Sequence, residues 1–236
     1  KNQKNVKRNT KIVVTFSEAV DPNSIIEDTN GNGIIGDCLD PETVDNFSFE
    51  LHCDRAKDTA LSITKEGESD ETWQASGFAV YENNNEVKTI LFRPLSLLGS
   101  KDGDILHIVR LIGGNNGIKN ISGNNIFENS RKDYYEWKFE TNTDIDLDPP
   151  YITRVTPENG RKLSKNSILQ IHFNEAMDPT QVQGFISATS PFTNIVMSNQ
   201  ITEGEWRITN GYKTIEFVSN SVCGENSCGD EVYCLD

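Results

Sequence analysis

The segment from Asp28 to Asp40 carries oxygen-bearing side chains at the spacing of a calcium-binding loop. Its sequence, DTNGNGIIGDCLD, begins with the form Asp-x-Asx-x-Asx-Gly. In such loops the first, third and fifth residues supply side-chain oxygens, a glycine makes the sharp turn, and the next residue supplies a carbonyl. Because calcium is a hard cation that takes roughly six to eight oxygens, this pattern predicts a calcium site. The predicted ligands are Asp28, Asn30, Asn32, Ile34, Asp37 and Asp40.

The loop departs from the helix-loop-helix type of calcium sensor. Leu39 stands where the acidic twelfth residue is expected, and two of the first three ligands are neutral amides. We therefore expect a weak structural site suited to extracellular calcium rather than a switch. The alternative is a turn rich in Asn and Gly, closed by local side-chain hydrogen bonds and clamped by Cys38.

The five cysteines fall into two groups that predict disulfides. Their spacing lacks the short paired knuckles and nearby histidines of common zinc sites, so disulfides of an exported protein are favoured over a metal site or free thiols. A bond from Cys38 to Cys53 would tie a long loop to the segment that follows it. In the second group one cysteine must be unpaired or bonded outside this chain, and the connectivity stays open. The second group is Cys223, Cys228 and Cys234.

Residue types that often catalyse reactions are present but scattered. His52, His107 and His172 each fall inside a predicted strand, where we expect sheet-surface residues rather than catalytic bases. Glu18 and Glu175 recur beside the same turn, so a structural role is favoured over a catalytic pair. The sequence therefore predicts no enzyme.

Tryptophans offer a second binding chemistry, because aromatic rings can stack on sugars. Trp137 belongs to a strand and is expected in the core, whereas Trp73 and Trp206 follow polar residues and could be exposed. A glycan is therefore kept as an alternative ligand, and an adhesin or carbohydrate-binding module as an alternative function.

Two separate segments of the chain repeat in the same order. Lys11 to Ile25 (KIVVTFSEAVDPNSI) returns as Ile168 to Val182 (ILQIHFNEAMDPTQV), and Val87 to Phe92 (VKTILF) returns as Tyr212 to Phe217 (YKTIEF). In each first segment, alternating apolar residues predict a half-buried strand, and the Asp-Pro that follows predicts a turn. The chain is therefore predicted to be a tandem of one kind of module.

These motifs resemble the bacterial Ig-like domains of the S-layer-protein type. Modules of that family open with a Pro-x-Ile strand, continue through an Asn-Gly turn to a strand ending in Phe-Ser-Glu-x-Met/Val-Asp-Pro, and close with Trp-x-Phe-x-Thr. The resemblance implies tandem Ig-like antiparallel β-sandwiches that act as structural repeats. The matching segments are Pro150 to Ile152, Pro157 to Gly160, Phe173 to Pro179, Ile90 to Pro94, Ile105 to Leu111, Ile121 to Asn125 and Trp137 to Thr141.

The alignment of the repeats sets the expected module boundaries. Module one is expected at 1–143, without its first strand and with the calcium-loop-like insertion at 27–40. A proline-stiffened linker follows at 144–150, and module two at 151–236 lacks its C-terminal strands. In the linker, Asp144, Asp146 and Asp148 alternate with apolar residues, so an acidic edge that holds calcium is an alternative to a solvated one.

Strand predictions for the rest of the chain follow from period-two patterns and from turn residues between them. Beyond the repeated segments, module one has predicted strands at Phe47–Cys53, Ala60–Thr64, Gly77–Glu82, Ile105–Leu111 and Tyr135–Thr141. Module two has them at Tyr151–Thr156, Phe185–Ala188, Asn194–Ser198 and Glu205–Thr209.

The net charge and the lengths of the apolar runs exclude some classes of partner. The net charge of −14 would repel phosphates, which argues against nucleic acid and anionic membranes as partners. No apolar run is long enough to insert into a bilayer. We therefore expect an extracellular or cell-surface segment with spacer or assembly roles, whose partners are neighbouring modules or chains. An accessory domain of a secreted hydrolase is a further alternative.

Overall fold

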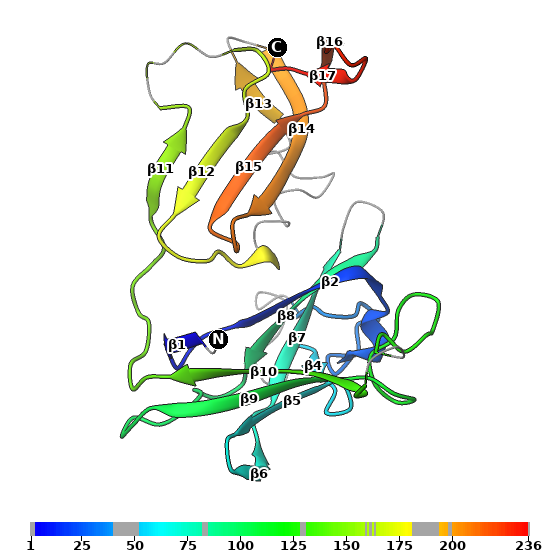
Figure 1. Ribbon diagram of the computed structural model, residues 1–236, viewed down its shortest axis with the longest axis vertical. Helices are drawn as coiled ribbons and strands as arrows, with labels where there is room; N and C mark the ends of the chain where they lie inside the picture. Colours follow the sequence, from blue (N-terminus) through cyan, green and yellow to red (C-terminus); the bar gives the residue numbers. More distant parts are fainter. Residues whose placement is uncertain are drawn as a thin grey trace. The chain divides into compact units, whose positions relative to one another are not determined.

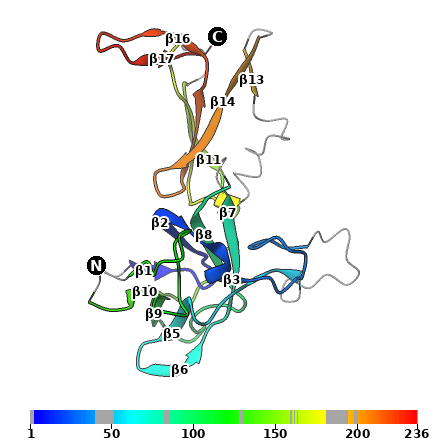
Figure 2. The same cartoon turned by 90° about the vertical axis from the view of Figure 1, so that its right-hand side faces the viewer.

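The computed structural model describes residues 3–39, 52–81, 85–127, 131–158, 160, 162, 164–180, 194–197 and 200–235. The chain divides into two compact units, Lys1–Leu147 (unit 1) and Asp148–Asp236 (unit 2). Almost all regular structure is strand, and most strands pair antiparallel (Figure 1, Figure 2). The prediction of an all-β protein with antiparallel sandwich sheets is confirmed.

Unit 1 contains two five-stranded sheets that enclose one hydrophobic core. The first sheet has the order β1-β10-β9-β5-β6 and the second β2-β8-β7-β4-β3. The apolar core packs between them, with Phe92, Ile63 and Ile90 fully buried. The strands are β1 Gln3–Val6, β2 Ile12–Val20, β3 Ile26–Glu27, β4 Arg55–Ala56, β5 Leu61–Lys65, β6 Glu68–Thr72, β7 Ala75–Tyr81, β8 Val87–Pro94, β9 Ile105–Ile112 and β10 Tyr134–Thr141, with a 3-10 turn, η1, at Pro22–Ser24.

The described residues of unit 2 form one five-stranded sheet and a separate hairpin. The sheet has the order β11-β12-β15-β14-β13, and β16 pairs with β17. Phe217 is fully buried, whereas Ile152 is 56% exposed. The strands are β11 Ile152–Thr156, β12 Leu169–Phe173, β13 Asn194–Met197, β14 Gln200–Thr209, β15 Thr214–Ser219, β16 Val222–Glu225 and β17 Glu231–Tyr233.

The sequence repeat is a structural repeat with the same strand register. Strand β2 pairs with β8 so that Ile12 lies opposite Phe92. Strand β12 pairs with β15 so that Leu169, the repeat counterpart of Ile12, lies opposite Phe217, the counterpart of Phe92. A third strand pairs with the other edge of the second one in each unit: β7 with β8 in unit 1, and β14 with β15 in unit 2. The strand order β2-β8-β7 in unit 1 therefore corresponds to the order β12-β15-β14 in unit 2.

The aspartate of the repeated Asp-Pro turn makes the same kind of side-chain hydrogen bond in both units. The side chain of Asp21 accepts a hydrogen bond from the backbone N–H of Asn23 at 3.0 Å. The side chain of Asp178 accepts one from the backbone N–H of Thr180, also at 3.0 Å. Each aspartate therefore accepts a hydrogen bond from a backbone donor two residues further along the turn, as its side-chain acceptor predicted.

Several strands differ from the sequence predictions. Strand β1 precedes β2 in unit 1, but it pairs with β10 and not with β2. No strand equivalent to β11 is found beside β2 among the residues described for unit 1. Strands β3, β4, β6, β16 and β17 were not predicted. Cys53 makes only an isolated bridge to Cys38, and the rest of the predicted strand at 47–51, like the one at Phe185–Ala188, lies outside the described residues.

The predicted linker is partly a component of unit 1. The side chain of Lys7 contacts Asp144, with Nζ 2.9 Å from Oδ2. Asn9 exchanges two hydrogen bonds with the backbone of Asp146, at 2.6 and 2.9 Å. The boundary between the units falls after Leu147, inside the segment 144–150. None of the described helical segments is long and apolar enough to cross a membrane.

Candidate functional site

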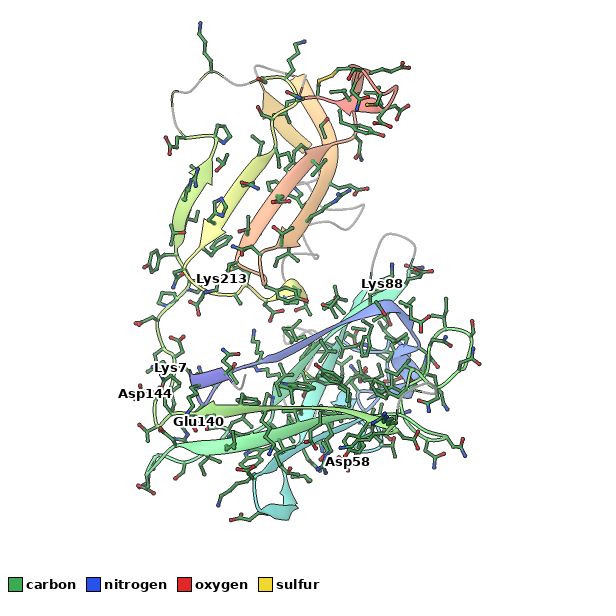
Figure 3. The ribbon with its side chains drawn as sticks, viewed as in Figure 1. Lys7, Asp58, Lys88, Glu140, Asp144 and Lys213 are labelled. Carbon is green, nitrogen blue, oxygen red and sulfur yellow. A yellow bond between two sulfur atoms is a disulfide. The ribbon has the colours of Figure 1, made fainter. Side chains whose placement is uncertain are left out.

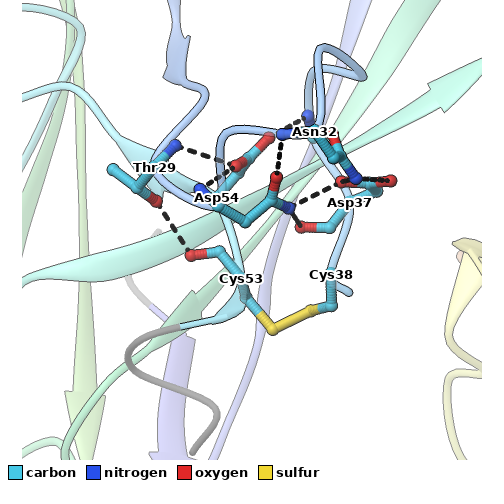
Figure 4. The surroundings of a disulfide bond; sticks show 8 residues. Thr29, Asn32, Asp37, Cys38, Cys53 and Asp54 are labelled. Atoms are coloured by element: carbon cyan, nitrogen blue, oxygen red, sulfur yellow. Dashed lines mark hydrogen bonds between the residues drawn. A yellow bond between two sulfur atoms is a disulfide. The ribbon is translucent and has the colours of Figure 1, made fainter. Parts of the chain in front are cut away.

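The described part of the predicted calcium loop runs from the end of the short strand β3 to Leu39, and its Cys38 is bonded to Cys53 (Figure 4). The disulfide closes a segment with a sequence separation of 15 residues. The backbone supports the same junction, because Leu39 N–H donates to His52 O at 2.9 Å and Asp54 N–H donates to Asp37 O at 3.0 Å. The loop is therefore clamped at its C-terminal end by covalent and hydrogen bonds.

Within the loop, the first three predicted ligands use their oxygens to fold the backbone. Asp28 accepts hydrogen bonds from Gly31 N–H at 2.6 Å and from Gly33 N–H at 2.9 Å. Asn30 Oδ1 accepts from Asn32 N–H at 3.0 Å, and Asn32 Oδ1 accepts from Ile34 N–H at 2.8 Å. Each of these oxygens has a further lone pair, so accepting one N–H does not prevent it from binding a cation.

Asp37 is held differently from the other predicted ligands. The side-chain amide nitrogen of Asn30 donates to Asp37 Oδ1 at 2.9 Å. The amide of Asn32 donates to both oxygens of Asp37, at 3.1 and 3.0 Å. Asp37 therefore closes the loop through neutral amide donors in this structure (Figure 4). Asp40, the last predicted ligand, lies outside the described residues.

The structure adds a carboxylate that the sequence motif does not contain. Asp54 follows Cys53 in the chain, and its side chain is fully buried behind the loop. Its oxygens accept three backbone hydrogen bonds, from Thr29 N–H at 3.0 Å, Asn30 N–H at 3.3 Å and Gly36 N–H at 2.8 Å. The predicted bond between Cys38 and Cys53 was the available signal for Asp54, because it places the residue after Cys53 beside the loop.

Burial raises the pKa of Asp54 above its ordinary value. The three backbone N–H groups oppose this rise, and the nearby charge of Asp28 adds to it. The pKa of Tyr81 is also raised, first by burial and then by the charges of Asp37 and Asp54. The Tyr81 hydroxyl donates to Ile35 O at 2.8 Å, so it covers the loop from strand β7. Several negative charges therefore share one partly buried region with no basic group among the contacts just described.

The donor set fits a hard cation in part. Asp28, Asn30, Asn32 and the Ile34 carbonyl retain oxygen lone pairs, and the Asp54 carboxylate supplies a buried charge. No cluster of three His, Cys, Asp or Glu side chains with metal-site geometry occurs among the residues that the structure describes. Any cation here would therefore depend on amide and carbonyl oxygens as well as carboxylates.

The second cysteine group forms one disulfide and leaves one thiol. Cys223 is bonded to Cys234 with a sequence separation of 11, and this bond links the ends of the β16-β17 hairpin. Cys228 is free and exposed in the turn between the two strands. The prediction that disulfides form is confirmed, and two disulfides in one chain indicate an oxidising compartment.

The prediction that all three histidines lie on sheet surfaces is wrong for His107. This residue lies on the inward side of β9 with Val109 and is fully buried. Its ring lies 4.9 Å from Trp73 and 5.2 Å from Phe139, and Nε2 is 3.0 Å from Thr141 Oγ1. His172 is half-buried on β12 beside Thr214, and His52 is not part of a strand.

The tryptophans are also more enclosed than expected. Trp73 is partly buried and packs against the core of unit 1. Trp206 is half-buried on β14, with its ring 5.2 Å from that of Phe217. Trp137 also packs against the core, as predicted. Trp73 and Trp206 therefore belong to different units, and internal contacts cover part of each ring.

Neither the models of known protein families nor the sequences of curated proteins gave a match to this chain.

Proposed function

We propose that this chain is a non-catalytic structural segment of an exported bacterial cell-surface protein, in which Ig-like modules serve as spacers or assembly units. The observation that carries the proposal is the repeated strand order with identical register in β2-β8 and β12-β15. Repetition of one module lengthens a chain and enlarges its surface, which suits a spacer. Family resemblance of the sequence motifs points the same way.

The strand order of unit 1 supports the Ig-like assignment. In Ig sandwiches, the second, fifth and fourth strands lie side by side in one sheet, and the third, sixth and seventh in the other. Strands β2-β8-β7 and β5-β9-β10 of unit 1 reproduce these two orders. Strand β1 then extends the second set beside the last strand, β10.

Location at the cell surface can be tested directly. Antibodies against this chain are expected to label intact cells of the source organism, and trypsin added outside is expected to remove the label. A cytoplasmic protein of the same cells serves as the negative control. Label that appears only after the cells are permeabilised would contradict the proposal.

The spacer proposal includes a structural calcium ion at the loop 28–37. Asp28, Asn30, Asn32 and the Ile34 carbonyl would hold the ion, and Asp37 would join them if the Asn30 and Asn32 amides turned away. The ion would neutralise carboxylates that now lie close together around the loop, which would stabilise the loop against proteolysis. The alternative is a loop closed only by its own hydrogen bonds and the disulfide.

Calorimetric titration with calcium separates these alternatives. We expect saturable binding in the range of extracellular calcium modules, with Kd of about 10⁻⁴ to 10⁻³ M, and a higher melting temperature of unit 1. Asp28→Ala should remove both effects, whereas Asp102→Ala, at an exposed turn outside the loop, should change neither. Absence of binding by the unsubstituted chain would favour the loop closed by its own bonds.

A further inference from the structure

Two steps of the calcium-type loop have the sequence Asn-Gly, in which the asparagine side chain is open to attack by the backbone. Asn30 precedes Gly31, and Asn32 precedes Gly33. Because glycine has no Cβ, its backbone nitrogen is not shielded, and it adopts conformations that other residues avoid. The nitrogen of each glycine can therefore approach Cγ, the side-chain carbonyl carbon of the asparagine before it.

The step from Asn32 to Gly33 is the more open of the two. Asn32 and Gly33 are both exposed, whereas Asn30 is half-buried. The φ angle of Gly33 is +81°, and a Cβ built on this residue would meet nothing within 4 Å. Water therefore reaches this step, and the backbone has room to form a succinimide ring.

Hydrogen bonds hold each group that takes part in such an attack. The Gly33 N–H donates to Asp28 Oδ2 at 2.9 Å, which is within reach for proton transfer to a base. The Ile34 N–H donates to Asn32 Oδ1 at 2.8 Å, so it stabilises the negative charge that develops on this oxygen. The side-chain amide of Asn32 donates to both oxygens of Asp37, at 3.1 and 3.0 Å (Figure 4). The nucleophile, the carbonyl oxygen and the leaving amide each have a partner.

We propose that Asn32 loses its amide spontaneously in the folded chain, and that the carboxylate formed strengthens the calcium site. The Gly33 nitrogen forms a bond to Cγ of Asn32 and gives its proton to Asp28. The bond from Cγ to Nδ2 then breaks, and Asp28 returns the proton through solvent to Nδ2, so that ammonia leaves and a succinimide remains. Water opens this ring at the bond between Cγ and the Gly33 nitrogen to give aspartate, or at the main-chain bond to give isoaspartate.

The aspartate product has a more strongly charged calcium loop. The loop then begins with Asp-x-Asn-x-Asp-Gly, and the calcium affinity of such loops depends on the number of charged ligands. The product also lacks the amide with which Asn32 holds Asp37. Two carboxylates then face each other and repel until a cation lies between them. This inference rests on the calcium site of the proposed function and adds the origin of one of its ligands.

Another Asn-Gly step, in unit 2, serves as an internal control. Asn210 and Gly211 are both exposed in the turn between β14 and β15, which Figure 3 marks by Lys213. A Cβ built on Gly211 would also meet nothing within 4 Å. The side-chain amide of Asn210 donates to the hydroxyl of Thr214 at 3.3 Å and not to a carboxylate. Among the described residues, no carboxylate accepts from the Gly211 N–H. The two steps therefore match in exposure and differ in the groups around them.

The test is to incubate the full chain with chelator at neutral pH and to measure the conversion of each asparagine by peptide mapping and mass spectrometry. Each rate is divided by the rate of the same step in urea, which removes the intrinsic reactivity of the local sequence. We expect this ratio to be about tenfold higher at Asn32 than at Asn210. Asp28→Asn keeps an acceptor oxygen but not the base, so it should lower the ratio at Asn32 and leave Asn210 unchanged. Slower conversion of Asn32 in the folded chain than in urea, or an equal rate in Asp28→Asn, would overturn the proposal.

Calorimetric titration tests the consequence for calcium. Asn32→Asp corresponds to the aspartate product and should bind calcium about tenfold more tightly than the fresh chain. Asn210→Asp is the matched control and should bind with the affinity of the fresh chain. Equal affinities of the fresh chain and Asn32→Asp would show that the new carboxylate does not strengthen the site. Binding by none of these chains would overturn the calcium site of the proposed function, whereas the deamidation is judged by the rates in chelator alone.

Discussion

The backbone N–H of Gly36 donates to Oδ2 of Asp54 at 2.8 Å. This bond joins the calcium-type loop to the residue that follows Cys53. This bond lies in the buried part of the structure, and Gly36 and Asp54 are both buried. Asp54 therefore organises the loop from behind, whether or not a cation is bound.

Asp54→Asn should test the buried charge. An amide keeps one acceptor oxygen but turns its NH₂ group toward one of the backbone donors, so we expect unit 1 to lose about 1–3 kcal/mol of unfolding free energy in chelator. We also expect the calcium-dependent rise in melting temperature to shrink, because a negative charge near the site is lost. Thermal melting with calcium and with chelator measures both. Asp102→Asn is the control, and an unchanged calcium effect in Asp54→Asn would exclude a role for Asp54 in binding.

Gly36→Ala should be much more costly than Gly33→Ala. Both glycines have left-handed backbone, with φ of +84° and +81°. A Cβ at Gly36 would overlap the backbone and side chain of Ala79, whereas a Cβ at Gly33 meets nothing within 4 Å. We expect about 1 kcal/mol of destabilisation at Gly33 from backbone strain alone, and a clearly larger loss at Gly36. Chemical denaturation of the two variants gives the comparison, and equal losses would contradict the packing argument.

The fold was predictable where two independent patterns agreed. Strands β2 and β12 combine period-two apolar residues with an Asp-Pro turn, and the repeat predicted that both units would contain them. Strand β1 was missed because QKNV has one apolar residue, and in the structure only Val6 of that strand is buried. Its pairing depends on the backbone of β10, which leaves no pattern in side chains.

Only those residues of the candidate site that lie close together in the sequence were predictable. Asp28, Asn30 and Asn32 lie within a few residues, and the structure brings their oxygens into one turn. Asp54 is separated from them in sequence, and it reaches the loop through the fold. The position of His107 was predictable, since it lies two residues before the buried Val109 and so on the same face of β9, but the general preference of histidine for surfaces pointed the other way.

Loss of the Cys38–Cys53 bond should destabilise unit 1 selectively. A crosslink that closes a loop of this size is expected to contribute about 3 kcal/mol by restricting the unfolded chain. We expect the double variant Cys38→Ala, Cys53→Ala to lower the unfolding free energy of unit 1 by about this amount. Cys223→Ala, Cys234→Ala is the matched control, because that disulfide lies in unit 2. Hydrogen exchange resolved by segment assigns each loss to its unit, and a loss spread over both units would contradict the prediction.

Acid should weaken unit 1 through His107. Burial lowers the pKa of His107 from 6.5 to about 4 in the folded protein. Between these values the unfolded chain binds a proton that the folded chain does not, so stability falls as pH falls from about 6.5 toward 4. The full shift corresponds to about 3 kcal/mol, and above pH 6.5 His107 contributes no pH dependence.

His107→Gln isolates this contribution. Glutamine can still hydrogen-bond to Thr141 but does not titrate, so the variant is expected to be less stable than the unsubstituted chain at pH 7, where ring contacts with Trp73 and Phe139 are lost. The difference between the two proteins should narrow as the pH approaches 4, because only the unsubstituted chain takes the protonation penalty. Urea unfolding of unit 1 at several pH values measures the difference. A constant difference from pH 7 to pH 4 would show that His107 is not the group that responds to acid.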